Sequence, residues 1–113
     1  MIENKLFSNK RYIIYKNEKS LAMNLDSFLL ADFVKLSNND NSLIELGCAT
    51  GVISMYIAIK RNKKIIVVDI DSEAIELFNK AALKNSIADK AKGQSINIMK
   101  LNNYYKPNSF DVV

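Results

Sequence analysis

The residues best suited to chemistry lie in one glycine-containing segment and at the end of an apolar run that follows it. The segment Glu45–Gly51 reads Glu-Leu-Gly-Cys-Ala-Thr-Gly, and Asp69 stands 18 residues after Gly51. Glycines at the carboxyl end of a strand allow a tight turn and a close approach of a ligand. A carboxylate about 20 residues farther on can accept hydrogen bonds from both ribose hydroxyls of a nucleoside. Glu45, two positions before Gly47, can attract a cationic ammonium group.

The same segment disfavours a dinucleotide cofactor. The fingerprint G-x-G-x-x-G is not met, because Ala49 and Val52 hold the positions of its second and third glycines. The carboxylates and glycines instead suit a nucleoside that bears an amino acid, a description that S-adenosylmethionine fits. A structural alternative stays open, in which the glycines only form a turn and Glu45 and Asp69 are polar strand ends.

Composition excludes several other kinds of site. The chain has 113 residues, no histidine and one cysteine, Cys48. An internal disulfide, a Ser-His-Asp triad, a Cys-His dyad and a zinc site are therefore excluded, and we expect no metal site. No apolar run approaches the roughly 18 to 20 residues of a membrane span, and the first residues lack the apolar region of a secretory signal. We expect a cytoplasmic protein that does not enter a membrane.

The charge balance suits a polyanionic partner. The chain has 16 Lys and Arg against 12 Asp and Glu, a formal net charge of +4. The first nineteen residues concentrate this surplus, with five basic residues against Glu3 and Glu18. Nucleic acid is the partner that such a segment predicts. Genome base composition explains the richness in lysine equally well, so charge alone leaves both interpretations open.

The elements that must position these residues begin with an N-terminal β-ribbon. The β-branched and aromatic segment Arg11–Tyr15 predicts a short strand, followed by a turn and by Ser20–Leu25. Asp26 or Ser27 then offers an N-cap to a helix that runs to about Leu36.

From Ser42 onward the pattern changes to short apolar strands that alternate with helices, which predicts a parallel sheet. The expected elements are a strand at Leu43–Leu46, a helix at Val52–Arg61, a strand at Lys64–Asp69, a helix capped by Asp71 or Ser72 with Ile75, Phe78 and Ala82 on its inner face, a strand at Gln94–Met99 and the start of a fourth strand at Phe110–Val113. The unbroken apolar run before Asp69 predicts burial on both faces. Because the last residues lie within an apolar strand, we expect the first part of a larger fold and self-association through an open sheet edge.

Three segments carry a family resemblance. Glu45–Ala58, ELGCATGVISMYIA, resembles motif I of class I S-adenosylmethionine-dependent methyltransferases, and Val67–Asp71, VVDID, resembles their second motif. Tyr15–Val34 is similar to the N-terminal segment of the subfamily that methylates N6 of an adenine beside the anticodon of a valine tRNA. The resemblance implies an α/β, Rossmann-like methyltransferase fold with helices flanking a parallel sheet, truncated at the fourth strand. It also implies one domain over residues 1–113, with a β-ribbon extension at 1–25 and a βαβαβ core at 42–113.

The resemblance assigns roles to individual residues. In the family an aspartate opens the first helix beside the cofactor, a position that Asp26 occupies, and Asn102 stands where an aspartate accepts from the adenine amino group. The implied S-adenosylmethionine-binding residues are Asp26, Glu45, Gly47, Gly51, Asp69 and Asn102.

The implied activity is methyl transfer to adenine N6 in tRNA. The family strand that Phe110–Val113 matches leads into Asn-Pro-Pro-Tyr, which holds the target amine, but the only proline here is Pro107. We therefore assign no catalytic residue and expect these 113 residues to be inactive alone. Two alternatives remain open: a non-catalytic cofactor-binding fragment, and a methyltransferase of the same fold that acts on protein glutamine or on another nucleic acid.

Overall fold

The computed structural model describes residues 2–5, 12–16, 30, 34–47 and 51–113. Its elements are β1 (Ile2–Lys5), β2 (Ile13–Lys16), β3 (Ser42–Leu46), α2 (Val52–Lys60), β4 (Lys64–Asp69), α3 (Ser72–Lys84), β5 (Ala91–Ser95) and the 3-10 helix η1 (Ile98–Asn103).

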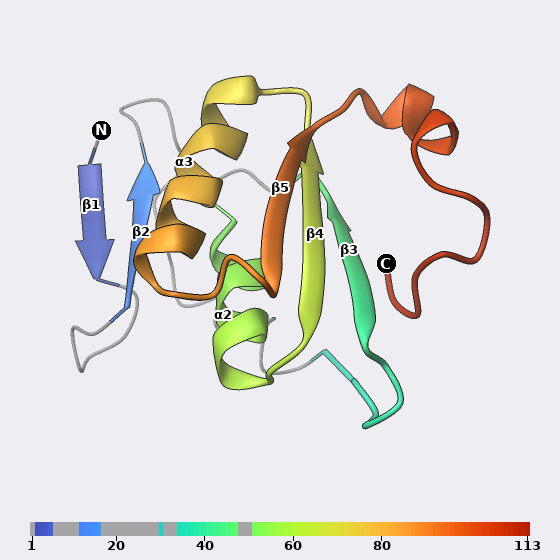
Figure 1. Cartoon of the computed structure of the whole chain (residues 1–113), viewed down its shortest axis with the longest axis horizontal. Coiled ribbons are helices and arrows are strands. Elements are labelled where there is room, and N and C mark those ends of the chain that lie inside the picture. The colour runs from blue at the N-terminus through green and yellow to red at the C-terminus, as the bar shows by residue number, and fades with distance from the viewer. Residues whose placement is uncertain (1, 6–11, 17–29, 31–33, 48–50) are drawn as a thin grey trace.

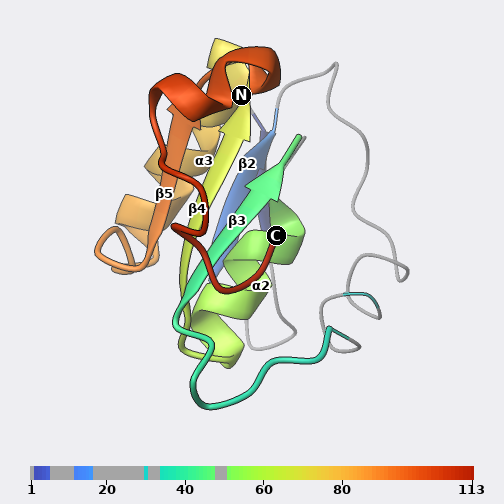
Figure 2. The ribbon, with the colours of Figure 1, turned by 90° about the vertical axis from the view of Figure 1, so that its right-hand side faces the viewer.

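The main sheet is parallel, with the strand order β3-β4-β5. Helix α2 connects β3 to β4, and α3 connects β4 to β5, so both connections move across the sheet in the same direction. Right-handed crossovers of this kind place both helices on one face of the sheet. Figure 1 shows α2 and α3 on that face, and η1 with the C-terminal segment on the other. Figure 2 shows the C-terminal segment passing in front of β3, and its last residues, Val112 and Val113, reach the cavity that α2 lines. The predicted Rossmann-like α/β arrangement is confirmed.

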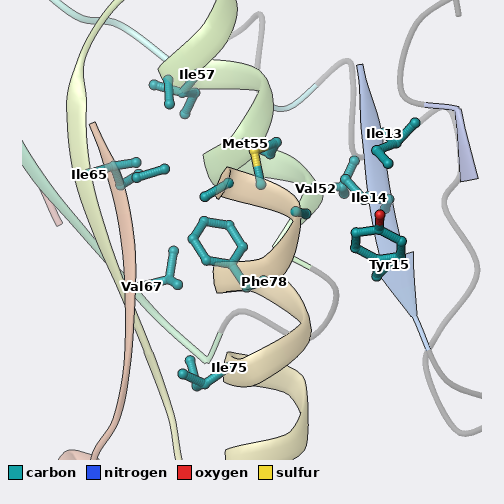
Figure 3. Packing of buried hydrophobic residues seen from close by; sticks show 14 of the residues in the cluster. Ile13, Ile14, Tyr15, Val52, Met55, Ile57, Ile65, Val67, Ile75 and Phe78 are labelled. Carbon is teal, nitrogen blue, oxygen red and sulfur yellow. The ribbon is translucent and has the colours of Figure 1, made fainter. Parts of the chain in front are cut away.

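The main core fills the space between the sheet and the two helices. Ile65 and Val67 of β4 point into it, and Phe78 of α3 is only 1% exposed at its centre (Figure 3). Val68 is buried on the opposite face with Ile44 and Ile96. The predicted burial of this strand on both faces is therefore confirmed.

Helix α3 begins and packs as its sequence predicts. The carboxylate of Asp71 accepts hydrogen bonds from the backbone N–H groups of Glu73 and Ala74, so Asp71 is the N-cap. Ile75, Phe78 and Ala82, the three residues predicted on the inner face, are all buried.

The β-ribbon is held on α3 by a buried amide. Asn85, at the C-terminal end of α3, accepts from the backbone N–H of Ile13 at 2.9 Å and donates to the carbonyl of Ile13 at 2.7 Å. This pair of bonds satisfies the backbone N–H and carbonyl of Ile13 as a neighbouring strand would. Lys80 adds a cation–π contact, with its ammonium 5.0 Å from the centre of the Tyr15 ring.

The N-terminal predictions are only partly confirmed. A strand forms at Ile13–Lys16, close to the predicted segment, but it pairs antiparallel with β1, which was not predicted. Ser20–Leu25 lies outside the described residues. The prediction that the next helix reaches about Leu36 is wrong, because residues 34–37 are not helical, although the N–H of Val34 still donates a helix-type hydrogen bond to the carbonyl of Leu30.

The predicted strand Gln94–Met99 is wrong in its bounds, because β5 starts three residues earlier and ends at Ser95. Ala91 and Gly93 are small enough to lie beneath α3, and a Cβ at Gly93 would come within 3.2 Å of Ile75. The apolar residues that suggested a strand beyond Ser95 instead belong partly to η1.

The predicted fourth strand is present as one parallel bridge. Val112 pairs with Leu43 at the outer side of β3, where a fourth strand would lie. The carboxylate of Asp111 accepts from the backbone N–H groups of Asn41 and Ser42, which anchors the segment at the start of β3.

Candidate functional site

The carboxyl ends of β3 and β4 meet at one edge of the sheet. Gly47 follows β3, and its backbone N–H donates to the carbonyl of Val68 at 2.8 Å. Gly47 has a φ of 76°, in the left-handed region that favours glycine, and among the described residues other than its chain neighbours no atom lies within 4 Å of the position a Cβ would take. The turn therefore leaves open space directly beside the backbone, as a close approach of a ligand requires.

In contrast to Gly47, Gly51 is tightly packed against another residue. Its φ is 73°, but a Cβ there would lie 2.3 Å from Cδ2 of Phe78. The contact with α3 thus requires glycine independently of any ligand. Gly51 is also the N-cap of α2 and has no side chain to bond the helix's first N–H groups. Its predicted cofactor role stays a prediction, whereas its packing role is visible in the structure.

Asp69 ends β4 next to the Gly47 turn. Leu46 and Val68 are register partners, which places Gly47 and Asp69 at the ends of adjacent strands. Oδ1 of Asp69 accepts from the backbone N–H of Asp71 at 2.9 Å, which orients the carboxylate. An ionised carboxylate has about four acceptor positions, so it can accept further hydrogen bonds. Ile70, the next residue, is 71% exposed and adds apolar surface beside this carboxylate.

Glu45 lies in a cleft of about 320 Å³ on the α2 side of β3. Ser54 Oγ donates to Glu45 Oε1 at 2.6 Å, and apolar residues form most of the wall, among them Val34, Ile53 and Val113. Burial raises the pKa of Glu45, and the hydrogen bond from Ser54 partly opposes that increase. Ser54 is a site residue that was not predicted, although a serine within an otherwise apolar helical stretch was an available signal.

Asn102 lies apart from Glu45. It is exposed on η1 and lines a hollow of about 490 Å³ with Ile44, Tyr105 and Phe110, on the face of the sheet opposite α2 and α3. Neither this hollow nor the Glu45 cleft is lined by Gly47 or Asp69. Of the six predicted cofactor residues, the structure places Gly47 and Asp69 together and Glu45 and Asn102 in separate cavities.

Part of the predicted cofactor site cannot be placed in the structure. Asp26 and the middle of the glycine turn, residues 48–50, lie outside the described residues. Within the described part of the chain, no three His, Cys, Asp or Glu side chains gather as metal ligands, and no helix is both long and apolar enough to cross a membrane.

Two comparisons relate the chain to known proteins. A model of the family described as "Methyltransferase domain" matches residues 37–113. Over 73 residues the chain is 32% identical to a "tRNA1(Val) (adenine(37)-N6)-methyltransferase" of Phocaeicola vulgatus, a match that covers 65% of this chain and 31% of that protein. The chain thus spans about a third of the length of this curated relative. The family match includes every strand of the parallel sheet, and with them Gly47 and Asp69.

Proposed function

The chain belongs to the methyltransferase domain family, and on that premise we propose that it binds S-adenosylmethionine at the carboxyl edge of its sheet, as part of an enzyme that methylates adenine N6 in tRNA. The proposal rests on one observation above all. An open glycine turn at Gly47 and an oriented carboxylate at Asp69 lie at the ends of adjacent parallel strands. Ligands of open α/β sheets bind at this edge.

Each residue has a separate part in binding. Asp69 accepts from the ribose hydroxyls, and its hydrogen bond from the Asp71 N–H keeps it in position to do so. Gly47 lets the ligand approach the backbone, while the exposed side chain of Ile70 offers apolar contact to a flat base. The amino-acid end of the ligand extends from Gly47 past Leu46 into the Glu45 cleft, where the Glu45 carboxylate, which accepts a hydrogen bond from Ser54, attracts the ammonium group.

When bound, S-adenosylmethionine supplies an already activated methyl group, so the protein's contribution is position and exclusion of water. The adenine of a tRNA is proposed as acceptor because the curated relative carries that activity in its name. A tRNA substrate also accords with a cytoplasmic enzyme. The 113 residues contain no Asn-Pro-Pro-Tyr, so we assign none of them to the target amine.

Titration calorimetry with S-adenosylmethionine tests the proposal. We expect measurable binding to the unchanged protein and at least a tenfold loss in Asp69→Ala, since about 1.4 kcal/mol corresponds to tenfold. Asp89→Asn is the matched control, because Asp89 is an exposed carboxylate at the opposite edge of the sheet. Absence of binding by the folded protein at millimolar ligand, or equal loss in both variants, would contradict the proposal.

A further inference from the structure

Three lysines, two in strands and one directly before a strand, converge at the amino edge of the sheet, opposite the Gly47 turn. Lys64 opens β4, Lys90 directly precedes β5, and Lys92 is the second residue of β5. The parallel register pairs Ile66 with Lys92, so residues far apart in sequence become neighbours. All three lysines line one hollow of about 240 Å³. In Figure 1 this edge is at the bottom of the sheet, away from η1.

These three residues, the lysine cluster, are poorly neutralised by the protein. Among the described residues, the ammonium groups of Lys64 and Lys92 take part in no hydrogen bond or ion pair, and the ammonium of Lys90 donates a hydrogen bond only to the amide oxygen of Asn62. Asp89 is the one carboxylate among the residues that line the hollow, which leaves a formal surplus of two positive charges. Lys63 lies next in sequence, with its ammonium bonded to the carbonyl of Ser37 at 2.8 Å.

Like charges held together repel one another, and an anion between them would relieve that repulsion. Lysine ammonium groups bind phosphate as point charges, and a row of them fits the repeated phosphates of a nucleic acid backbone. At about 3.3 Å per residue, β4 separates the lysine cluster from the carboxyl edge by roughly 20 Å. A structured RNA is long enough to reach both edges.

We propose that the lysine cluster binds backbone phosphates of the same RNA whose adenine is methylated at the carboxyl edge. This inference rests on the proposed function, since it names a contact surface for that substrate. The contact carries no sequence information and acts by holding and orienting the RNA.

The test is tRNA binding by the variant Lys64→Gln/Lys90→Gln/Lys92→Gln at several salt concentrations. We expect affinity to fall tenfold or more, and the slope of log affinity against log salt to decrease by about 2 to 3, because each of the three lost phosphate contacts removes roughly 0.7 to 0.9. The matched control, Lys64→Arg/Lys90→Arg/Lys92→Arg, keeps the charge and should keep both affinity and slope. Thermal unfolding and calorimetry with S-adenosylmethionine, unchanged in both variants, show that the fold and the cofactor site persist.

The outcomes separate this inference from the proposed function. An unchanged affinity and salt slope in the glutamine variant would overturn the inference. A failure to bind tRNA at all would overturn it too. A protein that binds tRNA through the lysine cluster but does not bind S-adenosylmethionine would support the inference and contradict the proposed function.

Discussion

The two faces of the parallel sheet use the same strands for different purposes. On the face covered by α2 and α3, the buried cluster includes residues from both helices, the three strands and the ribbon. On the opposite face, the buried cluster among the described residues consists of Ile44, Val68 and Ile96, while Met99 of η1 remains 87% exposed. Since burial of apolar area is the main source of stability, the helix-covered face should contribute most of it. Substitutions on the two faces can test this difference.

The largest effect is expected for Phe78→Ala on the helix-covered face. Phe78 is among the largest fully buried side chains, and its ring lies against Gly51 and Gly93. Its removal leaves a cavity between α3 and the sheet, which should lower the unfolding free energy by about 3–5 kcal/mol. Urea unfolding followed by circular dichroism measures the loss. A loss below about 1 kcal/mol would contradict the central role of this face.

The next prediction compares the two glycines. Gly51→Ala places a methyl group against the Phe78 ring and also forces alanine into the left-handed region, so we expect a loss of about 2–4 kcal/mol. The methyl group of Gly47→Ala meets no atom of the described residues beyond its chain neighbours, so the variant should lose only about 1–2 kcal/mol for its backbone conformation. Urea unfolding of both variants under the same conditions shows which substitution lowers the unfolding free energy more. Equal losses would show that the Phe78 contact does not set the requirement at Gly51.

A smaller effect is expected for Phe110→Ala on the opposite face. Phe110 is half-buried and makes an edge-to-face contact with Tyr105, with ring centres 5.0 Å apart. Because less apolar area becomes exposed than at Phe78, the loss should be about 1–2 kcal/mol. Leu83→Ala, at an exposed position of α3, is the control and should change stability by less than about 0.5 kcal/mol. If Phe110→Ala costs as much as Phe78→Ala, the two faces contribute equally.

The smallest effect on stability is expected for Glu45→Gln, which removes a titratable group from the helix-covered face. Burial raises the pKa of Glu45 in the folded protein, so its contribution to stability is full below the ordinary pKa of 4.5 and is lost as pH rises through the raised value. Glutamine does not titrate and keeps an oxygen that can accept from Ser54.

The stability of Glu45→Gln relative to the unchanged protein should therefore increase from pH 4.5 upward, by less than about 1 kcal/mol in total. Unfolding free energies measured from pH 4 to pH 8 test this. A relative stability that decreases over that range would contradict the sign.

The sequence predicted those parts of the fold whose signals lie within a few residues. The apolar run of β4, the Asp71 cap and the inner face of α3 all follow from spacing and side-chain type, and each is confirmed. The bounds of β5 could not be found in this way, because Ala91 and Gly93 are weak strand formers and are selected by the space beneath α3. The pairing of β2 with β1 was missed because Ile2–Lys5 has no clear alternation of its own.

For the candidate site, the sequence by itself determined the residue types: two glycines in a turn, a carboxylate before it and another after the next strand. Only the tertiary structure decided what each of them contacts. Gly47 has open space, Gly51 has Phe78 against it, and Glu45 has Ser54. The lysine cluster likewise exists only because the parallel register aligns β4 with β5. The physical reason is that turns and caps depend on neighbours in sequence, whereas such contacts depend on how helices and strands far apart in the chain are packed.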